Sequence, residues 1–513
     1  MKTFLGLFSF IFVLLINMPT HAMKSEPIGD QVFLHKITLE NWLDSPKDAP
    51  TILRILKLFN NSKAQLLSND SVWVNHAPLE IIDDLMTGRI KTPLQPGTDG
   101  IYQHIPNIPF LAKWIIPNNN YVISIGDLHS NFAGLKEILS NMHSLRLFKS
   151  DGSMQLENNV KLIFLGDYMD RGYCPIETFI TAALLYLKNP KQVLLLRGNH
   201  ENIAINLNSY GLRLKIDELP NASEETTSNI VEELSKSYEF LPVGAFIGYQ
   251  DSLPTKFIFH VHGCVDIRIN CKDLLEFETI NLSQNGGLKL WKFGRENIMS
   301  PEELSRYYKD IIPNFDNLIK YFLEALTNPD PTSGFLWNDI SFGQPSFLNK
   351  SERGHEVINL AICMIKKYLE IYNSDNTKVC GLVRGHQHNL PKETYKRIQK
   401  NAEEILHRNS STEGISCLID YDEIIGQNVY RKMTPACVFN IRTGPATTCI
   451  LQHNTLPLDF DNNFWVATLI SCSIIENQEL QILYPPTFLS LKCNQTTGQH
   501  SLQTIYDTFL LQE

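Results

Sequence analysis

Five short runs in the middle of the chain most constrain what it can fold into. Each run has the length of a β-strand and is mostly apolar: Tyr121–Ile125, Lys161–Leu165, Gln192–Leu196, Phe257–Val261 and Val379–Val383. A strand with so few polar residues must be covered on both sides, as in a buried sheet. Helical patterns, such as Leu135–Met142 and Glu177–Leu187, separate the first runs. The alternation of strands and helices predicts a wound α/β core.

Polar residues follow each predicted strand directly. The five polar segments are Gly126–Asn131, Gly166–Gly172, Arg197–Glu201, His260–Gly263 and Arg384–His388. The ends of strands are where α/β proteins usually build their sites. The carboxylate, amide and imidazole groups gathered here are ligands typical of Mn, Fe or Zn, and no thiolate accompanies them. The pattern therefore predicts a metal site of the catalytic kind.

These segments resemble the motifs of the calcineurin-like metallophosphoesterases: GD-x-H, GD-x-x-DRG, RGNHE, HG and GH-x-H. The combination of DRG with RGNHE resembles the phosphoprotein phosphatase branch, whose members are metal-dependent serine/threonine phosphatases. Leu336–Asp339 also resembles the LWSDP segment of that branch. The resemblance covers about 119–486. It implies a metallophosphoesterase-type α/β sandwich with two central mixed β-sheets flanked by helices.

The resemblance also implies two metal ions per chain, divalent or trivalent, with Mn, Fe and Zn all open. The first ion would be held by Asp127, His129 and Asp167. The second would be held by Asp167, Asn199, His262 and His386, so that Asp167 bridges the pair. His388 matches a second histidine of the wider superfamily and is a further candidate ligand.

The implied reaction is hydrolysis of a phosphomonoester by direct attack of a hydroxide bound to both metals. His200 matches the general acid of the family, and Asp170 would orient it. Arg171 would bind the phosphate, because a guanidinium can grip two phosphate oxygens. Arg353 and Asn199 are further candidates for substrate binding. A phosphorylated protein or peptide is the expected substrate.

Two departures from the branch affect these expectations. Ser130 stands where the branch usually has glycine, next to the first metal site. The SAPNY loop of the branch is missing near residues 441–445. Its absence resembles divergent, bacterial-type members, some of which act on phosphotyrosine. The sequence therefore leaves serine, threonine and tyrosine phosphates open.

Two alternative functions also stay open. One is a phosphoesterase for nucleotides or dinucleoside polyphosphates, which share several of the motifs. The other is a non-catalytic binding module on a phosphatase scaffold. The 45 Lys and Arg residues against 55 Asp and Glu residues give a net charge of −10. Nucleic-acid binding is not expected, because it needs a basic surface. The sequence gives no indication of an oligomeric state.

The N-terminus has the pattern of a secretory signal peptide. Lys2 precedes the apolar run Phe4–Ile16, and a small residue, Ala22, follows. We therefore expect an exported protein, periplasmic or secreted, with 1–22 removed. No later run reaches the ~18 apolar residues of a membrane-spanning helix. The predicted organisation is a signal peptide at 1–22, an N-terminal extension at 23–118, a catalytic domain at 119–486 with insertions at 264–335 and 396–435, and a tail at 487–513.

Overall fold

The computed structural model describes most of the chain up to residue 386 and four short strands beyond it. The described residues are 28–45, 47–90, 94–96, 102–104, 107–116, 121–144, 146–249, 254–277, 285–309, 332–340, 348–350, 358–360, 362–386, 448–452, 465–468, 489–493 and 500–504. The predicted signal segment 1–22 and the predicted insertion 396–435 lie outside this part.

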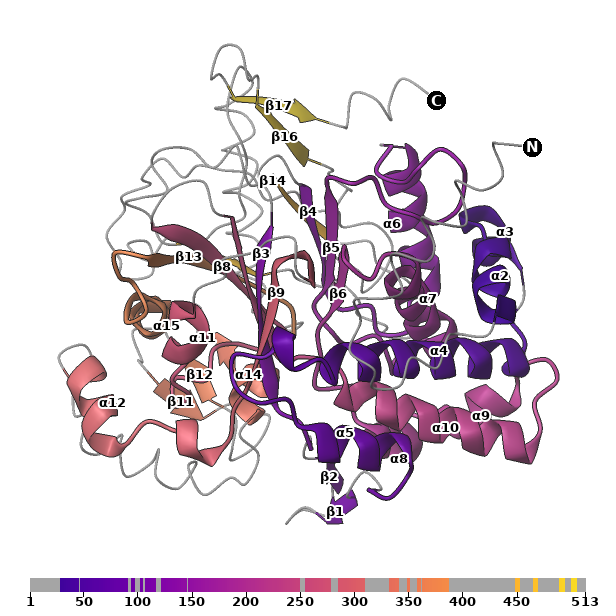
Figure 1. The fold of residues 1–513 in the computed structure, drawn as a ribbon, viewed down its shortest axis with the longest axis horizontal. Helices are drawn as coiled ribbons and strands as arrows, with labels where there is room; N and C mark the ends of the chain where they lie inside the picture. The colour runs from indigo at the N-terminus through magenta and orange to yellow at the C-terminus, as the bar shows by residue number, and fades with distance from the viewer. Residues whose placement is uncertain are drawn as a thin grey trace, which may run out of the picture.

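Two mixed β-sheets form the centre of the fold (Figure 1). All five predicted strands are present, as β4 (Tyr121–Ile125), β5 (Val160–Phe164), β6 (Val193–Leu195), β8 (Thr255–Val261) and β13 (Thr377–Arg384). The four-stranded sheet has the order β14-β4-β5-β6, and the six-stranded sheet has the order β15-β13-β8-β7-β3-β9. The added strands are β3 (Phe110–Ile116), β7 (Gly244–Tyr249), β9 (Leu288–Lys292), β14 (Thr448–Gln452) and β15 (Trp465–Thr468).

Each sheet contains both parallel and antiparallel pairs. Strands β4, β5 and β6 run parallel, whereas β14 is antiparallel to β4. In the larger sheet β13 is parallel to β8 and β15, while β7 is antiparallel to β8. The predicted fold class, an α/β sandwich with two mixed sheets, is therefore confirmed.

The two sheets pack face to face through one apolar cluster. Side chains of Val122, Ile163 and Leu194 from the smaller sheet meet Trp114 and Ile247 from the larger sheet. Alternate residues of the same strands point to the outer faces, because successive side chains of a strand alternate. These outer faces bury most of the remaining core, which explains why the strands read as nearly continuous apolar runs.

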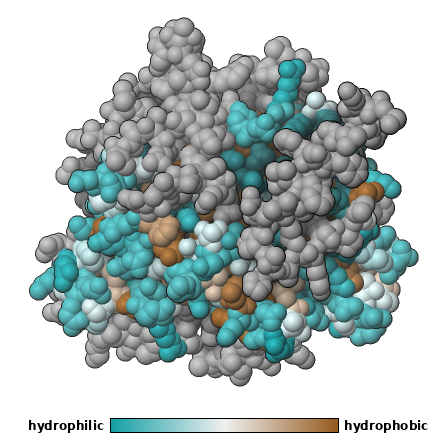
Figure 2. All heavy atoms as spheres, in the orientation of Figure 1, coloured by the Kyte–Doolittle hydropathy of each residue, from teal (hydrophilic) through white to brown (hydrophobic). Residues whose placement is uncertain are grey.

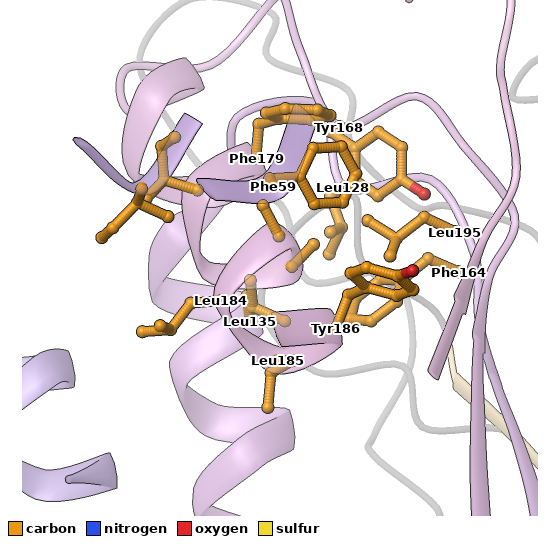
Figure 3. Close-up of a cluster of buried hydrophobic side chains, with 14 of the residues drawn as sticks. Phe59, Leu128, Leu135, Phe164, Tyr168, Phe179, Leu184, Leu185, Tyr186 and Leu195 are labelled. Atoms are coloured by element: carbon orange, nitrogen blue, oxygen red, sulfur yellow. The ribbon is translucent and has the colours of Figure 1, made fainter. Parts of the chain in front are cut away.

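Helices cover both outer faces (Figure 1). On the smaller sheet lie α4 (Ala49–Leu67), α6 (Phe132–Ser144), α7 (Pro175–Lys188) and α10 (Glu224–Glu239). On the larger sheet lie α11 (Lys272–Glu276), α12 (Pro301–Tyr308), α14 (Ser333–Trp337) and α15 (Ile362–Glu370). Aromatic rings join α4 and α7, where Phe59 packs against Phe179 (Figure 3). Phe179 also contacts Tyr168, which lies in the loop after β5.

The remaining elements are short. The helices are α2 (Ile28–Lys36), α3 (Leu39–Asp44), α5 (Leu79–Met86), α8 (Ile203–Ser209) and α9 (Leu212–Asp217), with 3-10 turns at Asp70–Val72, Asn285–Gly287 and Arg295–Asn297. The strands are β1 (Leu94–Pro96), β2 (Tyr102–His104), β10 (Asp339–Ile340), β11 (Leu348–Lys350), β12 (Ile358–Leu360), β16 (Leu489–Cys493) and β17 (His500–Thr504).

Residues ahead of the predicted catalytic domain take part in the same fold. Strand β3 lies inside the six-stranded sheet, between β7 and β9. Helix α4 runs from Ala49 to Leu67, and its buried side includes the polar residues Asn60 and Lys63. Strand β9, within the predicted insertion 264–335, pairs with β3.

The described surface is mostly hydrophilic on the face seen in Figure 2, with apolar side chains in small, separate groups. Among the described residues, no helix combines the length and the apolar character needed to cross a bilayer.

Candidate active site

Three histidines that follow strands each point one ring nitrogen at a main-chain carbonyl. The pairs are His129 Nδ1 with Met169 O at 3.2 Å, His262 Nδ1 with Leu165 O at 3.1 Å, and His386 Nε2 with Trp337 O at 3.1 Å. A carbonyl only accepts, so in the neutral ring these nitrogens carry the proton. The opposite nitrogen of each ring then presents a lone pair to the site, as in metal-ligating histidines.

The lone pairs of two of these histidines meet other acceptors. His262 Nε2 and His386 Nδ1 lie 3.1 Å apart, and Asn199 Oδ1 is 2.8 and 2.9 Å from them. Asp167 Oδ1 is 3.2 Å from His262 Nε2. Acceptors packed this closely repel one another unless a cation or a proton lies between them. The donor set, two imidazoles, one amide oxygen and one carboxylate, therefore fits a metal ion.

The second oxygen of Asp167 faces another histidine. Asp167 Oδ2 is 3.4 Å from His129 Nε2, and Asp127 Oδ2 is 4.0 Å from the same nitrogen. Asp167 Oδ2 is buried and accepts no hydrogen bond from any residue that the structure describes. The two oxygens of Asp167 thus face two ligand groups, which is the position of a bridging carboxylate. By distance alone Asp167 and His129 group with His200, and Asp127 is not part of that group.

Burial by itself raises the pKa of Asp167, but the neighbouring His262, His200 and His129 hold it well below its usual value. The carboxylate is therefore ionised at neutral pH. Asp127 is buried too, and its oxygens accept the main-chain N–H of His386 at 2.9 and 3.1 Å. Two buried carboxylates in one site need positive charge nearby.

The loops of the site have unusual backbone conformations. Of the nine described non-glycine residues with positive φ, six lie here: His129, Ser130, Asp167, Asp170, Arg171 and His386. Such conformations cost about 1–3 kcal/mol each and are typical of functional sites. Ser130, which replaces the expected glycine, keeps the left-handed turn with φ 62°. His129 and Ser130 therefore form a left-handed turn in this chain.

His200 and Asp170 form a hydrogen-bonded pair beside the candidate metal ligands. His200 Nδ1 lies 2.8 Å from Asp170 Oδ2, and Arg171 Nη2 donates to His200 Nε2 at 3.2 Å. The carboxylate fixes the imidazole so that Nε2 faces outward with the exposed Arg171. An imidazole, whose Nε2 accepts from Arg171, and a guanidinium therefore stand side by side at the edge of the candidate metal site.

Glu201 connects the loop after β5 with the loop after β6 through buried hydrogen bonds. Its carboxylate accepts the N–H groups of Asp167, Tyr168 and Gly198 at 2.7–2.9 Å. Burial and the charge of Asp167 raise the pKa of Glu201 to about 8. Arg197 is buried behind the site as well, where its Nη2 donates to Glu201 O. Both residues lie inside the RGNHE motif, which is the sequence feature that could have identified them. Nothing in the sequence indicates that they act from buried positions.

Asn206 and Tyr238 are site residues that no motif or spacing in the sequence identifies. They lie on α8 and α10 and connect to Asp170 through hydrogen bonds. Among the predicted residues, the structure brings together Asp127, His129, Asp167, Asp170, Arg171, Asn199, His200, His262 and His386. The two other predicted residues, Arg353 and His388, lie outside the described residues.

Known proteins share this region of the chain. The model of the family described as calcineurin-like phosphoesterase matches residues 121–390, more than half of the chain. The chain belongs to the calcineurin-like phosphoesterase family. The match begins at β4 and runs past His386, so it includes every described residue of the site.

Relatives within this family are serine/threonine protein phosphatases. The chain is 37% identical to the serine/threonine-protein phosphatase 6 catalytic subunit of Caenorhabditis elegans over 133 residues, 26% of this chain and 35% of the relative. It is 28% identical to the serine/threonine-protein phosphatase 4 catalytic subunit of Kluyveromyces lactis over 191 residues, 36% of this chain and 51% of the relative. The chain thus spans between about a third and a half of the length of these relatives.

A solved structure of a serine/threonine phosphatase from Saccharomyces cerevisiae is also similar. It matches with 16% identity and a TM-score of 0.32, covering 54% of this chain and 65% of its own.

Proposed function

We propose that the protein is a metal-dependent phosphatase that hydrolyses phosphomonoesters on serine, threonine or tyrosine of phosphoproteins. The observation that carries the proposal is the convergence of lone pairs from His262, His386 and Asn199 on Asp167, next to the His200–Asp170 pair. The first group would be Asp127, His129 and Asp167. The second would be Asp167, Asn199, His262 and His386.

Two metal ions in these groups would supply Lewis acidity and an activated water at neutral pH. Arg171 would bind the phosphate oxygens, since its guanidinium is exposed and lies 3.2 Å from His200 Nε2. Once Arg171 turns from His200 Nε2 to the phosphate and Nε2 takes up a proton, His200 would give that proton to the leaving oxygen. Asp170 would hold the ring in the required tautomer and stabilise its charged form.

The substrate class is supported by the relatives, which are protein phosphatase catalytic subunits. We also propose that the protein is exported, because Lys2 and the apolar run Phe4–Ile16 have the form of a signal peptide. A mature chain that begins at Met23 after expression in a secreting host would support export, and an intact Met1 would contradict it.

Phosphate release by the purified, Mn-loaded protein tests the function. The substrates are phosphoserine, phosphothreonine and phosphotyrosine peptides and a dinucleoside polyphosphate, and a His200→Ala variant runs in parallel. Peptide hydrolysis that is lost in the variant supports the proposal. The peptide that is hydrolysed fastest shows whether phosphoserine, phosphothreonine or phosphotyrosine is preferred. Hydrolysis of the dinucleotide alone would indicate a nucleotide phosphoesterase. Absence of any hydrolysis, with metal bound, would indicate a binding module.

A further inference from the structure

We propose that Asn206, held by Tyr238, is a positioning residue for the His200–Asp170 pair. The inference rests on the proposed function, in which His200 protonates the leaving oxygen. Neither residue belongs to the five polar segments that follow the predicted strands. Their place in the site follows only from the contacts between α8, α10 and the two loops.

Asn206 spans the two loops that carry the pair. Its Nδ2 donates to Asp170 Oδ2 at 2.8 Å and to His200 O at 2.9 Å. Asp170 belongs to the loop after β5, and His200 belongs to the loop after β6. One amide group therefore fixes the side chain of Asp170 relative to the main chain of His200.

Tyr238 fixes the orientation of that amide. Its hydroxyl donates to Asn206 Oδ1 at 3.0 Å, so the amide nitrogen must face Asp170 and His200. Both Asn206 and Tyr238 are completely buried, and the Tyr238 ring packs edge-on against Phe179 at 5.7 Å. In a buried site a hydrogen bond of this kind is not exchanged for water.

Asp170 needs such a constraint. Its backbone has φ 70°, a conformation that only surrounding contacts can maintain in a non-glycine residue. Asp170 Oδ2 accepts from both His200 Nδ1 and Asn206 Nδ2, each at 2.8 Å. If Asn206 is lost, Oδ2 loses one of these two donors and the carboxylate can turn away from the imidazole. The His200 ring then keeps its hydrogen bond to Asp170, but the carboxylate that makes this bond is held less firmly.

The test compares Asn206→Ala and Tyr238→Phe with the unmodified protein on two substrates. The probes are 4-nitrophenyl phosphate, whose leaving group needs little protonation, and phenyl phosphate, whose leaving group needs more. Ser237→Ala is the matched control, because it also removes one buried hydroxyl from α10, where Ser237 donates to Asn60 on α4. A double variant, Asp170→Asn with Asn206→Ala, completes the design.

We expect Asn206→Ala to lower kcat for phenyl phosphate about 10- to 100-fold, with less loss for 4-nitrophenyl phosphate and little change in KM. Tyr238→Phe should show the same preference more weakly, and Ser237→Ala should match the unmodified protein. The double variant should be as slow as Asp170→Asn alone, because both changes act on one carboxylate. If Asn206→Ala does not fold, the Tyr238→Phe rates decide.

Equal losses on the two substrates, or effects that multiply in the double variant, would overturn the inference and indicate a structural role. A protein whose activity depends on His200 but not on Asn206 or Tyr238 contradicts only this inference. An unmodified protein that hydrolyses neither substrate, nor any phosphopeptide, contradicts the proposed function itself.

Discussion

His262 Nε2 and His386 Nδ1 lie 3.1 Å apart, while the other nitrogen of each ring faces a main-chain carbonyl. The neighbouring strands β8 and β13 create this approach, because Val261 pairs with Arg384 and the histidines follow at the strand ends. Two neutral rings oriented in this way present lone pairs to each other. Without a cation, one ring must be protonated or the contact must be repulsive.

Metal should therefore stabilise the folded protein. At a metal concentration about 100 times the Kd, the free energy of unfolding should rise by about 2.7 kcal/mol. Denaturant unfolding of chelator-treated protein, with and without added Mn, measures the change. His262→Ala should lose most of the gain, whereas His143→Ala, an exposed histidine on α6, should keep it. An equal gain in both variants would contradict metal binding at His262.

Gly198→Ala should damage the metal site. A Cβ at this position would collide with the main-chain N and Oδ1 of Asp167 and would lie 2.7 Å from Glu201 Oε2. The Asp167 carboxylate, the proposed bridge, must shift, so activity at saturating metal should fall roughly 10- to 100-fold. Metal content and phosphate release measure the effect.

The matched control is Gly29→Ala on α2, where the nearest atom is Arg54 Nη2 at 4.0 Å. It should leave both quantities unchanged. Full metal content in Gly198→Ala would contradict the prediction, because the loop that carries Gly198 would then have made room for the Cβ without disturbing the site.

Ser130→Gly should stabilise the protein by up to about 1 kcal/mol, because φ 62° is costly for residues with a Cβ. The Ser130 hydroxyl is buried and has no hydrogen-bond partner among the described residues, so its removal costs little. Thermal unfolding measures the difference. The same change at Ser228, exposed inside α10, should instead destabilise by about 0.5 kcal/mol or more. Destabilisation by Ser130→Gly would mean that the hydroxyl has a contact of its own.

Lys63→Met should stabilise the protein in a pH-dependent way. Burial lowers the pKa of Lys63 from 10.5 to about 7. Between these values the unfolded chain binds a proton that the folded protein lacks, so stability rises with pH across this window. At pH 7 the substitution should add roughly 4 kcal/mol to the free energy of unfolding, and the gain should fall below about 1 kcal/mol at pH 10.

Unfolding curves at pH 7, 8.5 and 10 measure this trend, with Lys57→Met, an exposed position of α4, as the control. The contact of Lys63 Nζ with the Tyr186 ring, 4.0 Å from its centroid, opposes the gain. A gain that does not depend on pH would show that burial of the ammonium is not its source.

Much of the site could be predicted because its ligands directly follow buried strands. Asp127, Asp167 and His262 are placed by β4, β5 and β8, whose apolar composition identifies them as strands. The supporting contacts could not be predicted. The carbonyl of Trp337 orients His386, but a main-chain group carries no sequence signal. Asn206 reaches the site from a helix, where no spacing rule distinguishes it from a surface amide.

The fold was predictable to a similar degree. Strand β3 carries Lys113, whose ammonium is buried and donates to the carbonyls of Leu275 and Phe277. A lysine within a short apolar run, among prolines, gave no sign of a central strand. In α4 the buried Asn60 and Lys63 look, in the sequence, like a solvent-exposed end, so the apolar residues before them indicate only part of the helix.

Strand β3 also determines where this protein can be divided. It lies ahead of the family match at 121–390, yet among the described strands it is the only partner of β9, which lies inside the match. A recombinant fragment cut at the family boundaries would leave β9 without a neighbour and would open the edge of β7. Open apolar edges pair with other chains, so such a fragment would be prone to precipitate during purification. Anyone isolating the catalytic region should begin before Phe110.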